Sequence, residues 1–138
     1  MKGGGARGWL LVNKPTGVVC TRLGNQLKRL TGVSKLGHLG TLDPLARGVL
    51  PLALGDATKS IPCAEGWDKE YHFSIVWGEH RTTGDGAGTV MATSSVRPER
   101  DSVEEILPQF VGKIKQVPPI YSAQKVGNTR IMQKLIHH

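Results

Sequence analysis

Short segments with two different hydrophobic periods follow one another irregularly along this chain of 138 residues. Residues 9–13 and 49–54 are apolar runs that predict strands, and residues 71–77 alternate apolar and polar side chains like a half-buried strand. Leucines at helical spacing predict a helix over residues 23–30, which Gly32 is placed to end. This irregular alternation favours a mixed α+β domain over a regular series of βαβ units.

Further elements are expected around these segments. Pro51 places its strand at a sheet edge or at a bulge, because proline has no N–H for a ladder bond. Asp56 is expected to cap a short helix that runs through Lys59. The other extended segments expected are residues 18–21, 89–93 and 113–117.

Asp101 or Ser102 is expected to cap a second helix. Pro108 lies inside it and predicts a kink or an early end. Four apolar side chains at helical spacing form its expected inward stripe: Val103, Ile106, Leu107 and Phe110.

Size and composition indicate one globular domain with a modest core. No apolar run approaches the ~20 residues that a membrane span needs, and residues 1–8 read as a flexible leader without the apolar core of a secretory signal. Cys20 and Cys63 are isolated, so neither a structural metal site nor a disulfide framework is expected, and the cytoplasm is the expected compartment.

Basic residues are concentrated at the two ends of the chain. Residues 1–42 carry seven lysines and arginines and no acid, and the segment after Glu105 again carries bases without acids. Such a distribution suits a face that binds a polyanion. An ordinary basic surplus on a globular protein explains the charge equally well.

Asp43 is the first acidic residue of the chain and is followed by Pro44, which fixes a turn. Gly37 and Gly40 allow the backbone to come close to a ligand. Neighbouring positive charge favours the ionised carboxylate that a nucleophile or base requires. The basic neighbours are Lys35, His38 and Arg47. The alternative is that Asp43 caps a following helix and the glycines serve only the turn.

Four segments together carry a family resemblance. Residues 37–59 read GHLGTLDPLARGVLPLALGDATK, and residues 8–17 form an apolar run that ends in Lys-Pro-x-Gly. Residues 69–71 form a Lys-x-Tyr element, and residues 110–126 contain Gln-x-Pro-Pro-x-Tyr-Ser-Ala. In this order, and over nearly the whole of residues 9–126, they resemble the tRNA pseudouridine-55 synthase family, the TruB-type enzymes.

The resemblance implies a pseudouridine synthase-like α+β fold, with a mixed, largely antiparallel sheet and flanking helices. It implies isomerisation of a T-loop uridine of tRNA to pseudouridine, with tRNA as the partner and neither a membrane nor DNA involved. Asp43 matches the catalytic aspartate, which attacks the target nucleotide so that the glycosidic bond breaks. The uracil then rotates and rejoins through carbon. No metal, nucleotide cofactor or redox centre is implied.

Further site residues follow from the same resemblance. Tyr71 is expected to stack on the flipped-out uridine or to transfer a proton, and His38 to contact the RNA near that base. Lys14 supports the floor of the active site or meets a phosphate, unless it is a solvated turn lysine. Substrate contacts are also expected from Gly40, Thr41 and Arg47. Arg47, Lys28 and Arg29 suit contacts to the RNA backbone, although a solvent-facing helix explains Lys28 and Arg29 equally well.

Two regions depart from the family pattern. Residues 79–86 follow its Thr/Asp-rich loop only loosely, with Asp85 as the retained acid, and residues 127–138 form a divergent tail. Family members are about twice as long, and the absent part includes a strand whose arginine pairs with the catalytic aspartate. We therefore expect a truncated or frame-shifted catalytic domain with an incomplete sheet and weak or absent activity, unless a partner chain supplies the rest.

Two other interpretations remain open. The chain is a non-catalytic RNA-binding fragment that uses the same basic face, or it belongs to the guide-RNA-dependent branch of the superfamily, which shares Gly-Thr-Leu-Asp-Pro. The continuation Pro-Leu-Ala-Arg-Gly-Val-Leu-Pro favours the stand-alone bacterial type.

Overall fold

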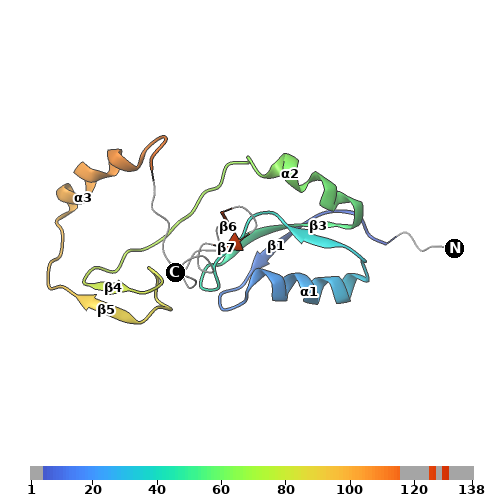
Figure 1. Cartoon of the computed structure of the whole chain (residues 1–138), viewed down its shortest axis with the longest axis horizontal. Helices are drawn as coiled ribbons and strands as arrows, with labels where there is room; N and C mark the ends of the chain where they lie inside the picture. Colours follow the sequence, from blue (N-terminus) through green and yellow to red (C-terminus); the bar gives the residue numbers. More distant parts are fainter. Residues whose placement is uncertain (1–4, 116–124, 127–128, 131–138) are drawn as a thin grey trace. The chain divides into compact units, whose positions relative to one another are not determined.

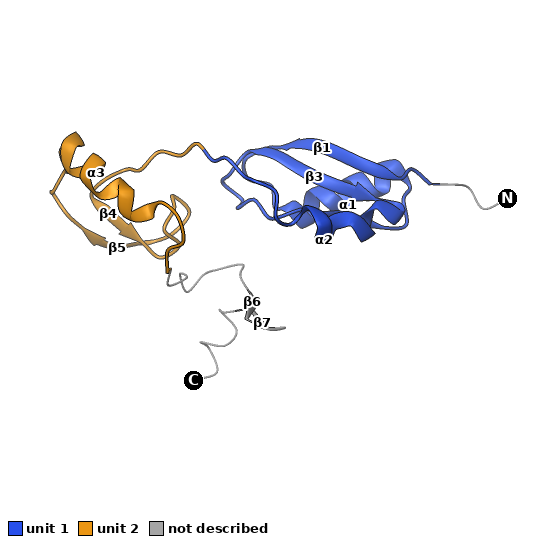
Figure 2. Cartoon of the chain, turned by 90° about the horizontal axis from the view of Figure 1, so that it is seen from above, with its two compact units in different colours: residues 1–71 blue, residues 72–138 orange. Residues whose placement is uncertain are grey.

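The computed structural model describes residues 5–115, 125–126 and 129–130. The chain forms two compact units, Met1–Tyr71 and His72–His138, which are coloured separately in Figure 2. Helices and strands are mixed, and every strand pair in the described residues is antiparallel. The expected α+β class with an antiparallel sheet is therefore confirmed. No helix in the described part of the chain is long and apolar enough to cross a bilayer.

The first unit is built on a three-stranded sheet with the order β1-β3-β2 (Figure 1). The strands are β1 (Gly8–Lys14), β2 (Leu36–His38) and β3 (Gly48–Leu54). The register pairs Lys14 with Gly48 at one end of β1 and His38 with Leu52 on the other side of β3. Both chain segments that bracket Asp43 therefore belong to this sheet.

Helix α1 (Cys20–Thr31) packs on the inner face of the sheet. Gly24 lets it approach closely, since a Cβ at this position would lie 3.2 Å from Leu36 Cδ2. The helix ends at Gly32, whose φ of 67° places it in the left-handed region favoured by glycine. Residues 18–21 were expected to be extended, and this is wrong from Cys20 onward, because α1 already begins there. The core of this unit contains Cys20, Leu50 and Leu52, with Leu10, Val12, Leu23, Leu27, Leu36 and Leu42 packed against them.

The outer face of the same sheet is covered only in part. A 3-10 helix η1 (Gly55–Ser60) and the short helix α2 (Ile61–Ala64) follow β3, and the Trp9 and Trp67 rings lie 6.1 Å apart between centroids. Leu11 and Val49 remain 70% and 65% exposed on this face. The expected incomplete sheet is consistent with this uncovered apolar surface.

Asp56 does not cap the helix after β3, contrary to expectation. Leu54 occupies the capping position without a side-chain hydrogen bond, and Asp56 lies in the first turn of η1. There its carboxylate forms an ion pair with Lys59 at 3.1 Å.

Pro51 lies in the central strand, so its expected place in an edge strand is wrong. Its carbonyl accepts a hydrogen bond from the Leu39 N–H at 2.9 Å, on the side of β3 that faces β2. The N and C=O of one strand residue point the same way, so the missing N–H also lies on that side. The β2–β3 register begins only at Leu52. The bond that proline cannot donate therefore lies on the β2 side, where the β2–β3 register stops at His38 and Leu52.

The second unit contains the hairpin β4 (Glu79–Arg81) and β5 (Val90–Thr93), and the two-residue strands β6 (Lys125–Val126) and β7 (Thr129–Arg130). The strand expected at residues 89–93 is confirmed as β5. The strand expected at residues 71–77 is wrong, because residues 68–76 form no helix or strand and their side chains are exposed. Alternating apolar and polar side chains form a half-buried strand only where the apolar face packs against another part of the protein.

Helix α3 (Arg100–Ile106) has Glu99 at its capping position, so the expected cap at Asp101 or Ser102 is wrong. The helix ends ahead of Pro108, which lies in the 3-10 helix η2 (Leu107–Phe110), so the predicted early end is confirmed. The inward stripe is wrong, since Ile106, Leu107 and Phe110 are exposed. Residues 113–115 form no strand, and residues 116–124, which include the expected Pro-Pro-x-Tyr-Ser-Ala segment, lie outside the described part.

Candidate active site

Asp43 lies in the loop that joins β2 to β3. Its carbonyl accepts a hydrogen bond from the Ala46 N–H at 3.0 Å, which closes a turn over Pro44 and Leu45. The strand β3 follows from Gly48, and no helix begins in the loop. Asp43 therefore does not cap a helix, and the alternative interpretation of this residue is wrong.

Lys14 lies beneath this turn and is fully buried. Its ammonium nitrogen donates to the carbonyl oxygens of Val18 at 2.7 Å, Pro15 at 3.0 Å and Pro44 at 3.3 Å. A buried ammonium is costly unless its hydrogens are bonded, and these carbonyls meet that requirement. Lys14 is thus neither a solvated turn lysine nor free to meet a phosphate, and it lies under the residue that follows Asp43.

Cys20 holds the residue on the other side of Asp43. Its sulfur lies 3.3 Å from both the nitrogen and the carbonyl oxygen of Leu42. The thiol donates to the carbonyl oxygen and accepts from the N–H. The thiol is buried at the start of α1. No sequence signal indicated this contact, because Cys20 and Leu42 are far apart in the chain.

The backbone is therefore anchored on both sides of Asp43, while its side chain is exposed. Within the described residues the carboxylate makes no hydrogen bond or ion pair, and it is not paired with Lys35, His38 or Arg47. A carboxylate that is fixed at its backbone and free at its oxygens suits a nucleophile that must reach an external substrate.

His38 ends β2, and Gly40 lies at the start of the loop that leads to Asp43. The His38 Nδ1–H donates to the Gly40 carbonyl at 2.5 Å, which in the neutral ring leaves Nε2 as an acceptor. Gly40 has a φ of 69°, a conformation that favours glycine. Thr41 and Arg47 are exposed in the same loop.

The Lys-x-Tyr element reaches this loop through its lysine. A Cβ on Gly40 would lie 3.8 Å from Lys69 Cε, so the Lys69 side chain runs beside Gly40. Tyr71 follows two residues later and is 59% exposed. In the part of the chain that the structure describes, its ring makes no aromatic contact and its hydroxyl no hydrogen bond. Lys69 is thus a neighbour of the site whose place there the sequence pattern alone did not indicate.

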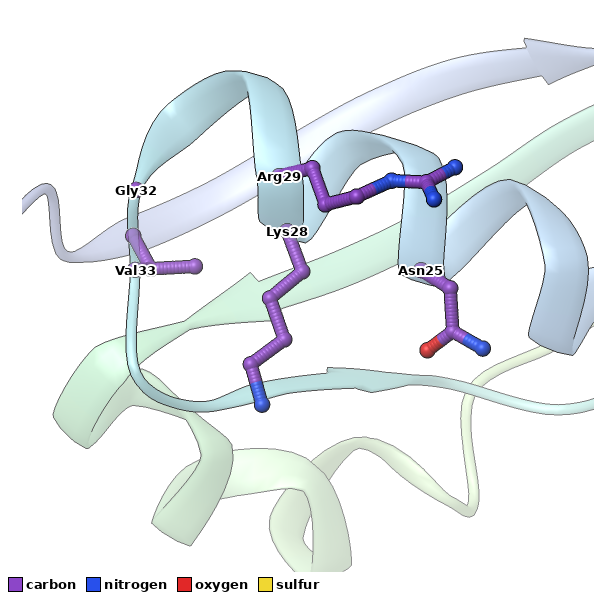
Figure 3. A pocket seen from close by; sticks show the side chains of 5 residues that line it. All are labelled: Asn25, Lys28, Arg29, Gly32 and Val33. Atoms are coloured by element: carbon purple, nitrogen blue, oxygen red, sulfur yellow. The ribbon is translucent and has the colours of Figure 1, made fainter.

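A shallow depression lies at the C-terminal end of α1, on another part of the first unit (Figure 3). It is lined by Asn25, Lys28, Arg29, Gly32 and Val33. Asp43 does not contribute to it. No cluster of three or more potential metal ligands occurs among the described residues.

An antiparallel sheet that presents Asp43 in a Gly-Thr-Leu-Asp-Pro loop matches what the resemblance implied for a pseudouridylate synthase domain. Residues 28–135 match the profile described as TruB family pseudouridylate synthase (N terminal domain). The chain belongs to this family.

Curated relatives are similar to the chain over most of its length. It is 47% identical over 129 residues to the tRNA pseudouridine synthase B of Rhodospirillum rubrum and 48% identical over 123 residues to that of Bradyrhizobium diazoefficiens. The protein of the same name from Caulobacter vibrioides is 46% identical over 129 residues. These alignments cover 89–94% of this chain but only 36–42% of the relatives. The chain thus spans about two fifths of their length.

Proposed function

We propose that this chain carries the catalytic aspartate of a tRNA pseudouridine synthase and that Asp43 is the nucleophile. The observation that carries the proposal is the position of Asp43, whose neighbours Leu42 and Pro44 are anchored by Cys20 and Lys14 while its carboxylate is exposed. The names of the relatives support tRNA as the substrate. The family resemblance of the loop supports a T-loop uridine as the target.

The proposed reaction is an isomerisation and needs no oxidant or second substrate. An Asp43 oxygen attacks the target nucleotide, and the bond between the ribose and the uracil nitrogen breaks. The uracil rotates, and one of its ring carbons bonds to the ribose while the bond between the nucleotide and the Asp43 oxygen breaks, which frees the carboxylate. That carbon loses its proton, and the nitrogen released in the first step gains one, so the atoms balance.

Other residues of the loop are proposed to bind the substrate. The uridine must leave its stack to reach Asp43, and an exposed aromatic ring provides a replacement stacking surface. Tyr71 is exposed and lies two residues from Lys69, whose side chain runs beside Gly40 in the Asp43 loop. His38, Thr41 and Arg47 supply hydrogen-bonding groups around the same loop.

Comparing the chain with its Asp43→Ala variant tests the proposal. A tRNA transcript is incubated with excess protein, and pseudouridine is quantified after digestion to nucleosides. Excess protein is used because the unpaired carboxylate and the exposed Leu11 and Val49 face lead us to expect slow turnover by this chain alone. Asp56→Ala is the matched control, since this exposed aspartate lies outside the Asp43 loop.

The proposal expects pseudouridine from the original chain and from Asp56→Ala, none from Asp43→Ala, and equal tRNA affinity for all three. Pseudouridine formed by Asp43→Ala would refute the assignment. Binding of tRNA without any modification by the original chain would favour the non-catalytic RNA-binding alternative.

A further inference from the structure

The solvent-facing side of α1 is basic and has no acidic neighbour in the helix. Arg22, Lys28 and Arg29 are exposed, and none of them forms an ion pair with a described residue. The first acid of the chain is Asp43, so nothing in residues 1–42 neutralises these charges locally. The three positive charges are therefore available to an external anion.

Helix stability explains only part of this charge. Lys28 and Arg29 lie in the last turn of α1, where cations favour the helix dipole. Arg22 lies near the other end, where a cation is unfavourable, and the first turn contains no acid. Helix stability thus does not explain all three residues. What they share is a positive charge on an exposed side chain, which suits binding to an anionic partner.

The depression at the end of α1 offers donors to such a partner. Figure 3 shows the Asn25 and Lys28 side chains extending toward the same side of the helix, whereas the Arg29 side chain extends along the helix in a different direction. An amide, an ammonium and a guanidinium together present several N–H donors, and no acid lines the depression. Such donors fit phosphate groups.

The exposed side of α1 does not suit a lipid surface. Membrane-surface helices combine basic residues with a broad apolar face. Here the apolar side chains Leu23 and Leu27 pack on the core, and Leu30 is the one large hydrophobic residue of α1 that is exposed. A sugar-phosphate backbone needs positive charge and donors without such a face.

The helix also sets the distance from the reacting centre. Its first residue, Cys20, is bonded to Leu42 beside Asp43, whereas Arg29 lies nine residues further along α1. At 1.5 Å per residue this places Arg29 about 13 Å along the helix axis from Cys20. A phosphate bound there belongs to a different part of the RNA from the nucleotide that reacts.

We propose that Lys28, with Asn25 beside it, and Arg29 each bind a backbone phosphate of the RNA substrate at this distal end of α1. These contacts position the RNA relative to Asp43 and carry no sequence information themselves. The inference rests on the proposed function only for the choice of RNA as the polyanion.

The salt dependence of tRNA binding tests this inference. Affinity for a tRNA transcript is measured between about 50 and 200 mM monovalent salt for the original chain and for Lys28→Gln/Arg29→Gln. The slope of log K against log salt is negative, and each lost phosphate contact makes it less steep by about 0.7–0.9. The slope of the double variant is therefore expected to be less steep by about 1.5. Lys28→Arg/Arg29→Lys is expected to keep the slope.

Lys59→Gln/Arg100→Gln is the matched control, because it removes the same charge from two exposed residues elsewhere. An equal loss of slope in this control would show a general charge effect and overturn the inference. So would an unchanged slope in Lys28→Gln/Arg29→Gln, or tighter binding to phosphatidylserine vesicles than to tRNA at the same salt. If the slopes differ as expected but the original chain forms no pseudouridine, the result counts against the proposed function and leaves the phosphate contact supported.

Discussion

The ammonium nitrogen of Lys14 lies 3.3 Å from the carbonyl oxygen of Pro44, the residue that follows Asp43. This bond joins the end of β1 to a loop 30 residues later in the chain. The Pro44 carbonyl also accepts from the Gly17 N–H at 2.7 Å. The Lys-Pro-x-Gly turn and the Asp43 loop thus form one hydrogen-bonded structure, which explains how two separated motifs serve one site.

Replacing Lys14 with methionine is expected to lower the free energy of unfolding by about 2 kcal/mol. Methionine fills similar space, but the carbonyls of Val18 and Pro15 lose the donor that the buried ammonium supplies. Urea denaturation measures the change. Lys59→Met, at a side chain that is 76% exposed, is expected to change stability by no more than about 0.5 kcal/mol. Equal effects of the two substitutions would contradict the buried role of Lys14.

The two cysteines are expected to react with a thiol reagent at very different rates. Cys63 is exposed, whereas Cys20 is buried and bonded to Leu42. In the native protein one equivalent of thiol is expected to react quickly, and the second only after denaturant is added. Cys63→Ser should abolish the fast phase. A persistent fast phase in that variant would show that Cys20 is accessible.

Alanine substitutions at Gly32 and Gly66 are expected to have opposite signs. A Cβ added at either residue would meet no atom within 4 Å, so space is not the difference. Gly32 has a φ of 67°, and alanine there costs about 1 kcal/mol. Gly66 lacks a positive φ. Alanine there is expected to stabilise the protein by about 0.5 kcal/mol, because it lowers the conformational entropy of the unfolded chain. Thermal unfolding of both variants checks this, and equal signs would contradict the left-handed C-cap of α1.

The pKa of Asp85 is lowered from its ordinary value of 3.8, chiefly by the Thr83 hydroxyl and also by the Ala87 N–H. A lowered pKa adds stability that is present above pH 3.8 and is lost as the pH falls through the folded-state pKa. Thr83→Val is expected to raise the pKa of Asp85. The stability gap between this variant and the original chain should therefore close below about pH 4.

Carboxyl NMR titration measures the pKa of Asp85 in both proteins. Thr89→Val is the matched control, because the loop uses the backbone N–H of Thr89 rather than its hydroxyl. An Asp85 pKa that stays the same in Thr83→Val would show that the hydroxyl bond does not hold the loop.

Much of the first unit follows from local sequence patterns. Leucine spacing and Gly32 define α1, and the apolar runs of residues 9–13 and 49–54 become β1 and β3. The period of two in β1 also places Lys14 on the inner face with Leu10 and Val12. That signal was sufficient to predict its burial, but a lysine next to Pro-x-Gly is more readily interpreted as a turn residue.

Other features depend on contacts that no local pattern contains. The bond between Cys20 and Leu42 joins segments brought together only by folding. The alternation of Tyr71, Phe73 and Ile75 predicted a strand, yet these side chains are exposed because no described strand pairs with them. The position of Asp43 in its loop was predictable from the motif, whereas the anchoring on both sides required the structure.

The most direct test of the central claim is single-turnover conversion of tRNA uridine to pseudouridine by the original chain and by Asp43→Asn. Asparagine keeps the size of the side chain and removes the charge and the nucleophilic oxygen pair. We predict pseudouridine from the original chain, none from Asp43→Asn, and the same tRNA affinity for both. Equal pseudouridine formation by the two proteins would contradict the assignment of Asp43 as the nucleophile.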